Sequence, residues 1–134
     1  MYEIVVGIDR DETRARAQAT ELTSLPLDTE SVHVTLVHDF EQNREGAFVT
    51  QIASVRRAKE LLEDAGIDVS LEGTSGDPGA AIRQVADDQD ADLIVLAGRK
   101  RSPAGKALFG SVTQDVILGT DRSVLVVSSE RDED

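Results

Sequence analysis

The sequence predicts a doubly wound α/β fold, in which helices cover both faces of a parallel β-sheet. Three observations lead to this class. Short runs rich in β-branched residues recur along the chain, and segments with helical periodicity separate them. Most of the runs are apolar throughout, which is typical of strands that are buried on both faces. Strands that alternate with helices also favour right-handed crossovers, which make the strands parallel.

Five segments are expected to form the strands of this sheet. Four of them are continuous apolar runs, at Ile4–Ile8, Val32–Val37, Leu93–Ala97 and Ser123–Val127. The fifth, Asp68–Gly73, alternates between polar and apolar residues. This alternation predicts a strand with one exposed face, or a strand at the edge of the sheet.

Four helices are expected between the strands. They are predicted at Thr13–Leu25, at Ile52–Ala65, from Pro78 onward and from Val112 to Gly119. Gly66 is well suited to end the second helix, and proline is favoured in the first turn of the third. With 134 residues, the chain is long enough for one domain with a single core.

The composition excludes several kinds of function. The chain has no cysteine, so disulfides, thiolate metal sites and thiol catalysis are excluded. A net charge of −12 argues against binding to nucleic acid or to an anionic membrane. No signal peptide is expected, and no apolar run reaches the length of about 20 residues that spans a bilayer. The sequence therefore predicts a cytoplasmic protein.

The charge also resembles that of proteins from organisms with molar salt in their cytoplasm. Arginine outnumbers lysine eleven to three, and aromatic residues make up only 3%. Repulsion within such an acidic surface is screened at about 1 M salt, where the Debye length is about 3 Å. The alternative is an ordinary acidic surface that maintains solubility.

One stretch of the acidic chain is basic. No carboxylate lies between Asp92 and Asp115, while the eight residues 99–106 hold four cations. The stretch follows the fourth predicted strand, and ligands of doubly wound sheets bind at the carboxyl ends of strands. It leads into Gly110 and Ser111 at the start of a predicted helix, where N–H groups and the helix dipole favour an anion. The alternative is that these cations only balance the surrounding acidic surface.

The order and spacing of several segments resemble the universal stress protein family over nearly the whole chain. These segments read IVVGID, VTLVHD, SGDPGAAI, ADLIVLAG, FGSVTQDVI and SVLVV. The resemblance implies a Rossmann-like sheet with strand order 3-2-1-4-5. It places one domain at residues 1–128 and leaves 129–134 as a charged, flexible tail. It also implies a homodimer formed through the last strand, by Val124, Leu125, Val126 and Val127.

In one branch of this family, the resemblance implies an ATP site, with Mg²⁺ bound only together with the nucleotide. The positions that match it at the nucleoside end are Asp9 and the backbone of Asp39. Those that match it at the phosphates are Gly98, Lys100, Arg101, Gly110, Ser111, Val112 and Thr113. Arg101 stands where the branch has a second glycine. The segment between Gly98 and Gly110 is one residue shorter than in the family pattern. Arg101 would either bind phosphate bidentately or fill the phosphate position itself.

These observations predict that the chain is a regulatory binding protein of the stress response rather than an enzyme. ATP would bias the dimer or its contact with an unidentified protein partner. One alternative is a nucleotide-free dimeric interaction module, in which Arg101 occupies the phosphate site. Another is an adenine-nucleotide hydrolase, for which the sequence offers no identifiable base.

Two other groups of residues have simpler interpretations. The acidic run that begins at Asp88 starts like a calcium loop but lacks its glycine and its final glutamate, so a solvated helix end is expected. Ser111, His38 and Asp9 could meet as a hydrolase triad, but the serine lacks a nucleophile-elbow sequence. His33 is expected to be structural, and His38 is a candidate to line the pocket.

Overall fold

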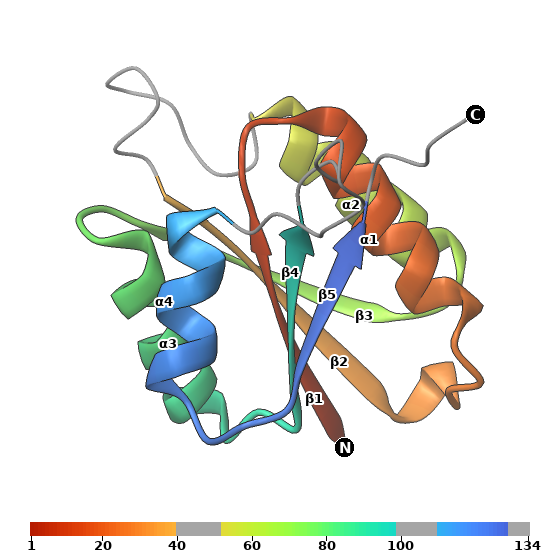
Figure 1. The fold of residues 1–134 in the computed structure, drawn as a ribbon. Coiled ribbons are helices and arrows are strands. Elements are labelled where there is room, and N and C mark those ends of the chain that lie inside the picture. Colours follow the sequence, from red (N-terminus) through yellow and green to blue (C-terminus); the bar gives the residue numbers. More distant parts are fainter. Residues whose placement is uncertain (40–51, 99–109, 129–134) are drawn as a thin grey trace, which may run out of the picture.

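The computed structural model describes residues 1–39, 52–98 and 110–128 (Figure 1). Within these ranges, five strands form one parallel sheet with the order β3-β2-β1-β4-β5. The strands are β1 (Tyr2–Ile8), β2 (Val32–Asp39), β3 (Asp68–Thr74), β4 (Leu93–Gly98) and β5 (Val124–Ser128). The predicted fold class and strand order are confirmed. The tail at 129–134 lies outside the described residues.

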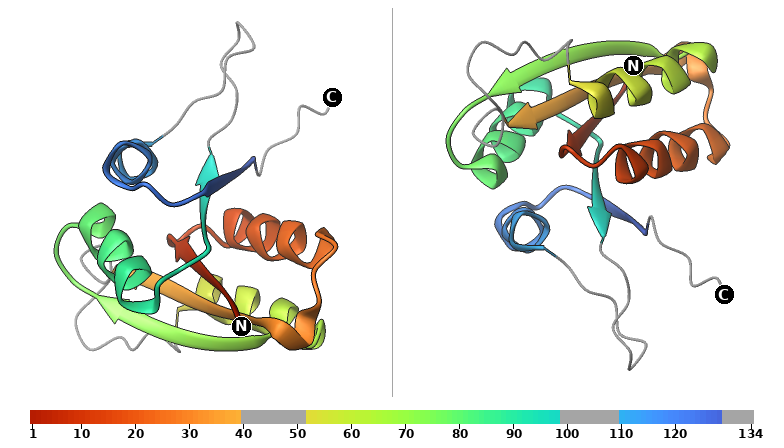
Figure 2. Two further views of the ribbon diagram at one scale, coloured as in Figure 1. Left: turned by 90° about the horizontal axis from the view of Figure 1, so that it is seen from below. Right: turned by 90° about the horizontal axis from the view of Figure 1, so that it is seen from above.

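Four α-helices cover the two faces of the sheet in the described part of the chain. They are α1 (Glu12–Ser24), α2 (Ala53–Asp64), α3 (Pro78–Gln89) and α4 (Ser111–Gly119). Helices α1 and α2 pack together on one face, and α3 and α4 on the other (Figure 2). A short 3-10 helix at Thr29–Ser31, which the sequence analysis did not predict, precedes β2.

Local signals set the helix ends. Asp11 caps α1 by accepting a hydrogen bond from the backbone N–H of Arg14 at 3.0 Å. Asp77 caps α3 in the same way, and Pro78 occupies its first turn. Gly66, with φ of +87°, follows the end of α2 and adopts the left-handed conformation that favours glycine. The predicted role of Gly66 is confirmed.

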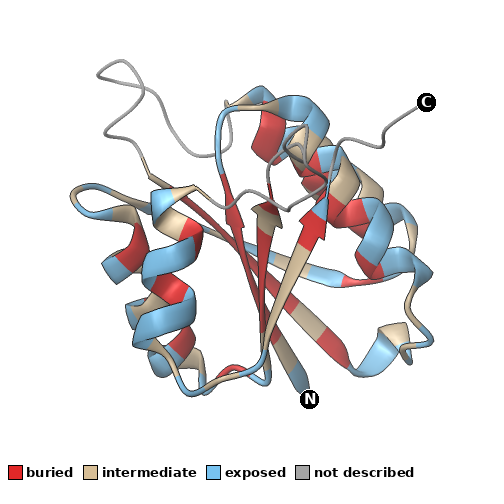
Figure 3. Ribbon diagram, in the orientation of Figure 1, coloured by how far each residue is buried: buried red, intermediate tan, exposed pale blue. Residues whose placement is uncertain are grey.

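Side chains that alternate along the strands build a separate core on each face. Ile4 and Val6 of β1 point toward α1 and α2, where Leu22 and Leu62 cover them. Val5 belongs to the other core, which lies beneath α3 and α4. The central strands are therefore buried on both sides, as their continuous apolar runs predict (Figure 3).

Strand β3 lies at an edge of the sheet and is the least buried strand. Val69 and Leu71 pack against the core beneath α1 and α2. Asp68, Ser70 and Glu72 alternate with them and are exposed. The polar face of β3 therefore lies on the side of the sheet away from α2. The prediction of an edge strand with one exposed face is confirmed.

Candidate functional site

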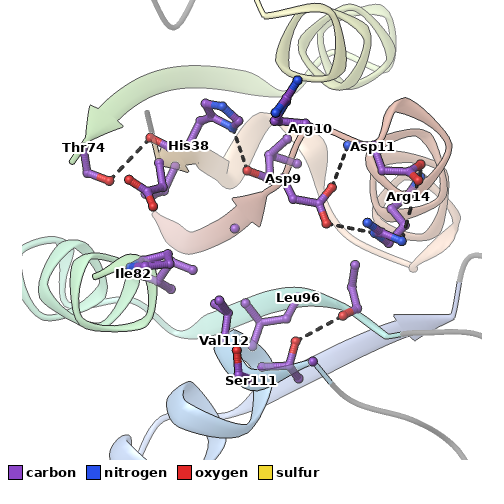
Figure 4. Close-up of a pocket in the computed structure, with 18 residues that line it drawn as sticks. Asp9, Arg10, Asp11, Arg14, His38, Thr74, Ile82, Leu96, Ser111 and Val112 are labelled. Atoms are coloured by element: carbon purple, nitrogen blue, oxygen red, sulfur yellow. Dashed lines mark hydrogen bonds and ion pairs between the residues drawn. The ribbon is translucent and has the colours of Figure 1, made fainter. Parts of the chain in front are cut away.

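A cavity of about 570 Å³ opens where the carboxyl ends of β1, β2 and β4 meet the start of α4 (Figure 4). Its volume is in the range of small-molecule sites. The residues that line it include Asp9, Arg14, His38, Asp39, Gly110, Ser111 and Thr113. The structure thus brings the first, second and fourth strand ends together, as expected for this sheet type.

The first turn of α4 faces this cavity. Gly110 precedes the helix with extended backbone angles, and among the described residues no side chain caps the helix start. By contrast, aspartates cap α1 and α3. Ser111 is exposed, and the side chain of Val112 lies across the cavity from Asp9 (Figure 4). Uncapped N–H groups at the positive end of a helix dipole are a suitable environment for an anion.

Thr113, which is predicted to bind phosphate, lines the cavity and also has a structural contact in this turn. Its side chain is buried, and Oγ1 donates a hydrogen bond to the carbonyl oxygen of Ala97 at 3.1 Å. This bond ties the first turn of α4 to the end of β4. Thr113 therefore holds the helix start in place, and the hydroxyl that is exposed at the cavity is that of Ser111.

Asp9 follows β1 and is held against the start of α1. Its Oδ2 lies 2.8 Å from Nε of Arg14, and its Oδ1 accepts from the backbone N–H of Asp11 at 2.9 Å. The Asp9 carbonyl oxygen accepts from Ser54 Oγ at 2.6 Å. Each carboxylate oxygen has a second lone pair for another donor. Asp9 is therefore oriented for a ligand, and Arg14 is a neighbour that the sequence analysis missed.

His38 lines the cavity but is almost fully buried. Its Nδ1 lies 2.8 Å from the carbonyl oxygen of Ile8, so Nδ1 carries the proton that bridges β2 and β1. The carbonyl of His38 in turn accepts a hydrogen bond from Thr74 at 3.4 Å. In a hydrolase triad the imidazole would bridge Asp9 and Ser111. Here Nδ1 is bound to Ile8, and Asp9 pairs with Arg14, so the contacts do not form that triad.

Two glycines at the strand ends act through packing. A Cβ on Gly98 would lie 3.0 Å from Cγ1 of Val126, so the missing side chain lets β4 approach β5. Gly98 is not among the described residues that line the cavity. Gly7 does line it, and a Cβ there would lie 2.7 Å from Cδ1 of Ile82. Gly7, which the sequence analysis did not select, lets α3 pack against the cavity floor.

The remaining predicted positions divide into two groups. Lys100 and Arg101, with the rest of the basic stretch, lie outside the described residues. The acidic run after α3 has other contacts: Asp90 pairs with Arg122 at 3.3 Å, and Asp92 accepts from the N–H of Glu3. In the described ranges, no group of three or more candidate ligands is placed to hold a metal ion. A calcium site therefore gains no support from these ranges.

Comparisons with known proteins place these features in a family. The sequence model of the universal stress protein family matches residues 1–128. A solved universal stress protein from Archaeoglobus fulgidus is 29% identical, with a TM-score of 0.68 and coverage of 95% of this chain and 98% of that one. A universal stress protein solved in complex with cAMP is 25% identical, with a TM-score of 0.70 and coverage of 96% and 98%.

A curated relative is matched over a shorter segment. A universal stress protein of Methanocaldococcus jannaschii is 29% identical over 92 residues, which cover 68% of this chain and 57% of the relative. The chain thus spans about half the length of the first curated relatives that it matches. Among the helices that the structure describes, none has the length and hydrophobicity to cross a membrane.

Proposed function

Because the chain belongs to the universal stress protein family, we propose that its cavity binds an adenine nucleotide as a regulatory ligand. The observation that carries the proposal is the uncapped start of α4, which opens onto a cavity of about 570 Å³ opposite an oriented carboxylate. A phosphate and a ribose need these two kinds of partner at opposite ends of one site. The likeness to the protein solved with cAMP supports the same ligand class.

The contacts suggest a role for each part of the site. Asp9 would accept hydrogen bonds from the ribose, with Arg14 and the Asp11 N–H holding its carboxylate. The backbone of Asp39 would contact the base. The N–H groups at 110–112 and the hydroxyl of Ser111 would bind phosphate. Lys100 and Arg101 would place positive charge beside the phosphates of ATP, and Mg²⁺ would bind only together with the nucleotide. Gly98 would contribute through packing.

We propose that the bound nucleotide regulates the formation of a dimer through β5. This strand lies at the sheet edge opposite β3 and, within the described part of the chain, pairs only with β4. The side chains of Val124, Leu125 and Val126 are apolar, yet they remain partly exposed. Pairing with a second copy would cover both the edge and these side chains. The domain at residues 1–128 would thus be both the binding and the assembly unit.

The experiment is isothermal titration of the protein with Mg-ATP and AMP at high KCl, which suits its acidic surface. We expect saturable binding at one site per chain, weaker for AMP. Gly110→Asp should abolish it, because it puts negative charge at the phosphate position. The matched control is Ser123→Asp, which adds the same charge at an exposed position beside the other end of the sheet.

Measurements on the wild type and on Gly110→Asp also distinguish nucleotide binding from the alternative functions. Wild-type protein that shows no heat with millimolar ATP would contradict nucleotide binding and favour the nucleotide-free module. Phosphate release above the level of Gly110→Asp would instead indicate a hydrolase. Sedimentation with and without ATP tests the output, because regulation of assembly requires that the nucleotide change the proportion of dimer.

A further inference from the structure

A second polar group of residues spans three adjacent strands, away from the nucleotide cavity. Nδ1 of His33 on β2 lies 2.7 Å from Oε1 of Glu3 on β1. Nε2 of the same imidazole lies 2.7 Å from Oγ of Ser70 on β3. The imidazole therefore bridges a carboxylate and a serine hydroxyl. We refer to Glu3, His33 and Ser70 as the serine relay.

The register of the sheet explains why these three side chains meet. Glu3 pairs with His33 across β1 and β2, and Ser70 pairs with Thr35, two residues along β2 from His33. All three side chains lie on the face away from α1 and α2, because they alternate with residues of that core. Glu3 lies near the beginning of β1, whereas the cavity lies beyond the end of this strand. The two sites are therefore separate.

The chemistry of the partners assigns the protons of the relay. A carboxylate can only accept, so Nδ1 of His33 carries a proton and donates it to Glu3. In the neutral imidazole, Nε2 then has a free lone pair and accepts from the hydroxyl of Ser70. This is the hydrogen-bond order of a serine that an imidazole base activates. The histidine that the sequence analysis interpreted as structural is thus also placed to act as a base.

Exposure to solvent increases along the serine relay from the carboxylate and the imidazole to the serine hydroxyl, as a nucleophile requires. The side chains of His33 and Glu3 are only 15% and 24% exposed. Ser70 is exposed on the edge strand. Two hydrogen bonds with Asp92 fix the backbone of Glu3. The N–H of Glu3 donates to Oδ2 of Asp92 at 2.9 Å, and the carbonyl oxygen of Glu3 accepts from the N–H of Asp92 at 2.8 Å. The base and its carboxylate are therefore shielded and held, while the hydroxyl is open to a reagent.

We propose that Ser70 is a nucleophile that accepts an acyl group from an activated ester. Oγ of Ser70 bonds to the carbonyl carbon of the ester, and the bond from that carbon to the leaving oxygen breaks. The serine proton moves to Nε2 of His33 and then to the leaving oxygen, which departs as an alcohol. Glu3 acts as a positioning residue and stabilises the imidazolium between these transfers. The products are an acyl ester of Ser70 and the free alcohol.

The test is the reaction of the full chain with p-nitrophenyl acetate, without nucleotide. Release of nitrophenolate gives the rate, and peptide mass spectrometry locates the acetyl group. We expect one acetyl group at Ser70 and none at Ser24 or Ser31. These two serines are internal controls, since both are exposed and hydrogen-bond to oxygen atoms of the chain rather than to an imidazole.

Variants separate activation from simple exposure. Ser70→Ala should remove the label, and His33→Gln should lower the rate at Ser70 by about 100-fold or more, the usual contribution of a general base. Thr35→Val changes the direct cross-strand neighbour of Ser70 but neither hydrogen bond of the relay, so this variant should react like the wild type. Glu3→Gln should slow the reaction at Ser70, because the imidazolium loses its carboxylate, whereas Glu3→Asp should keep part of the rate. If Glu3 only joined strands, neither substitution would change the rate at Ser70 in folded protein.

Two outcomes would overturn the proposal. One is acetylation of Ser70 no faster than that of Ser24 and Ser31. The other is a rate at Ser70 that stays the same in folded His33→Gln, or in folded Glu3→Gln if the histidine variant does not fold. In either case the relay would be only a hydrogen-bonded connection between three strands. Neither result bears on nucleotide binding, which the assay does not use.

Discussion

Two buried threonines should respond in opposite directions to the same substitution. Thr35 on β2 is 2% exposed, and its Oγ1 has no hydrogen-bond partner among the described residues. Thr113 on α4 is 5% exposed, and its Oγ1 donates to Ala97. Valine has nearly the shape of threonine but no hydroxyl. The substitution therefore removes an unsatisfied polar group at one position and a formed hydrogen bond at the other.

The magnitudes follow from the cost of burying a hydroxyl. An unpaired buried hydroxyl lowers the free energy of unfolding by about 1–3 kcal/mol, so Thr35→Val should raise it by about 1–2 kcal/mol. A typical hydrogen bond contributes about 1 kcal/mol, so Thr113→Val should lower it by about that amount. For a domain of this size, about 1 kcal/mol corresponds to a change in Tm of about 4 °C.

Urea denaturation followed by circular dichroism measures both changes. The transition midpoints should move in opposite directions while the m-values stay equal, because neither change alters the surface exposed on unfolding. Measuring the two variants together removes errors that affect both midpoints alike. A Thr35→Val protein less stable than the wild type would refute the reasoning, because it would mean that the hydroxyl is satisfied in solution.

Two further substitutions test the backbone and the nucleotide site separately. Gly66→Ala should lower the free energy of unfolding by about 1 kcal/mol, because the site requires a positive φ, although a Cβ there would meet nothing closer than 3.6 Å. Denaturation checks this value, and ATP binding should be unchanged. Asp9→Ala should weaken ATP binding by about tenfold, since a hydrogen bond to a charged group is lost. It should weaken binding of the 2′,3′-dideoxy analogue much less, and equal losses in titration would contradict a ribose contact.

The strands and helices were largely predictable because their signals are local. The apolar run at Ile4–Ile8 identifies a buried strand wherever it occurs, and Pro78 and Gly66 mark helix ends through their own backbone preferences. The predicted strands were short at their polar ends. Glu3 and His38 belong to β1 and β2, since backbone pairing with a neighbouring strand extends beyond the apolar residues. Pairing of this kind cannot be read from one segment alone.

The candidate site was predictable in place but not in detail. Asp9 and Ser111 lie where a parallel sheet brings its strand ends together, so their position followed from the fold class. The pairing of Asp9 with Arg14 and the use of Thr113 as an anchor depend on side-chain directions that the pattern of residues does not contain. Gly98 resembles a ligand-binding glycine in the sequence, but its neighbour Val126 explains its small size.

The sequence alone was enough to predict the α/β class, the five strands and the end of the sheet at which the cavity lies. These features depend on hydrophobic periodicity and on turn residues, whose effects act over a few neighbouring positions. Only the tertiary structure brought Glu3, His33 and Ser70 into contact, because dozens of residues separate them and strand register decides which side chains are adjacent. The partners of a polar side chain depend on this register, and they decide whether it stabilises the fold or can take part in chemistry.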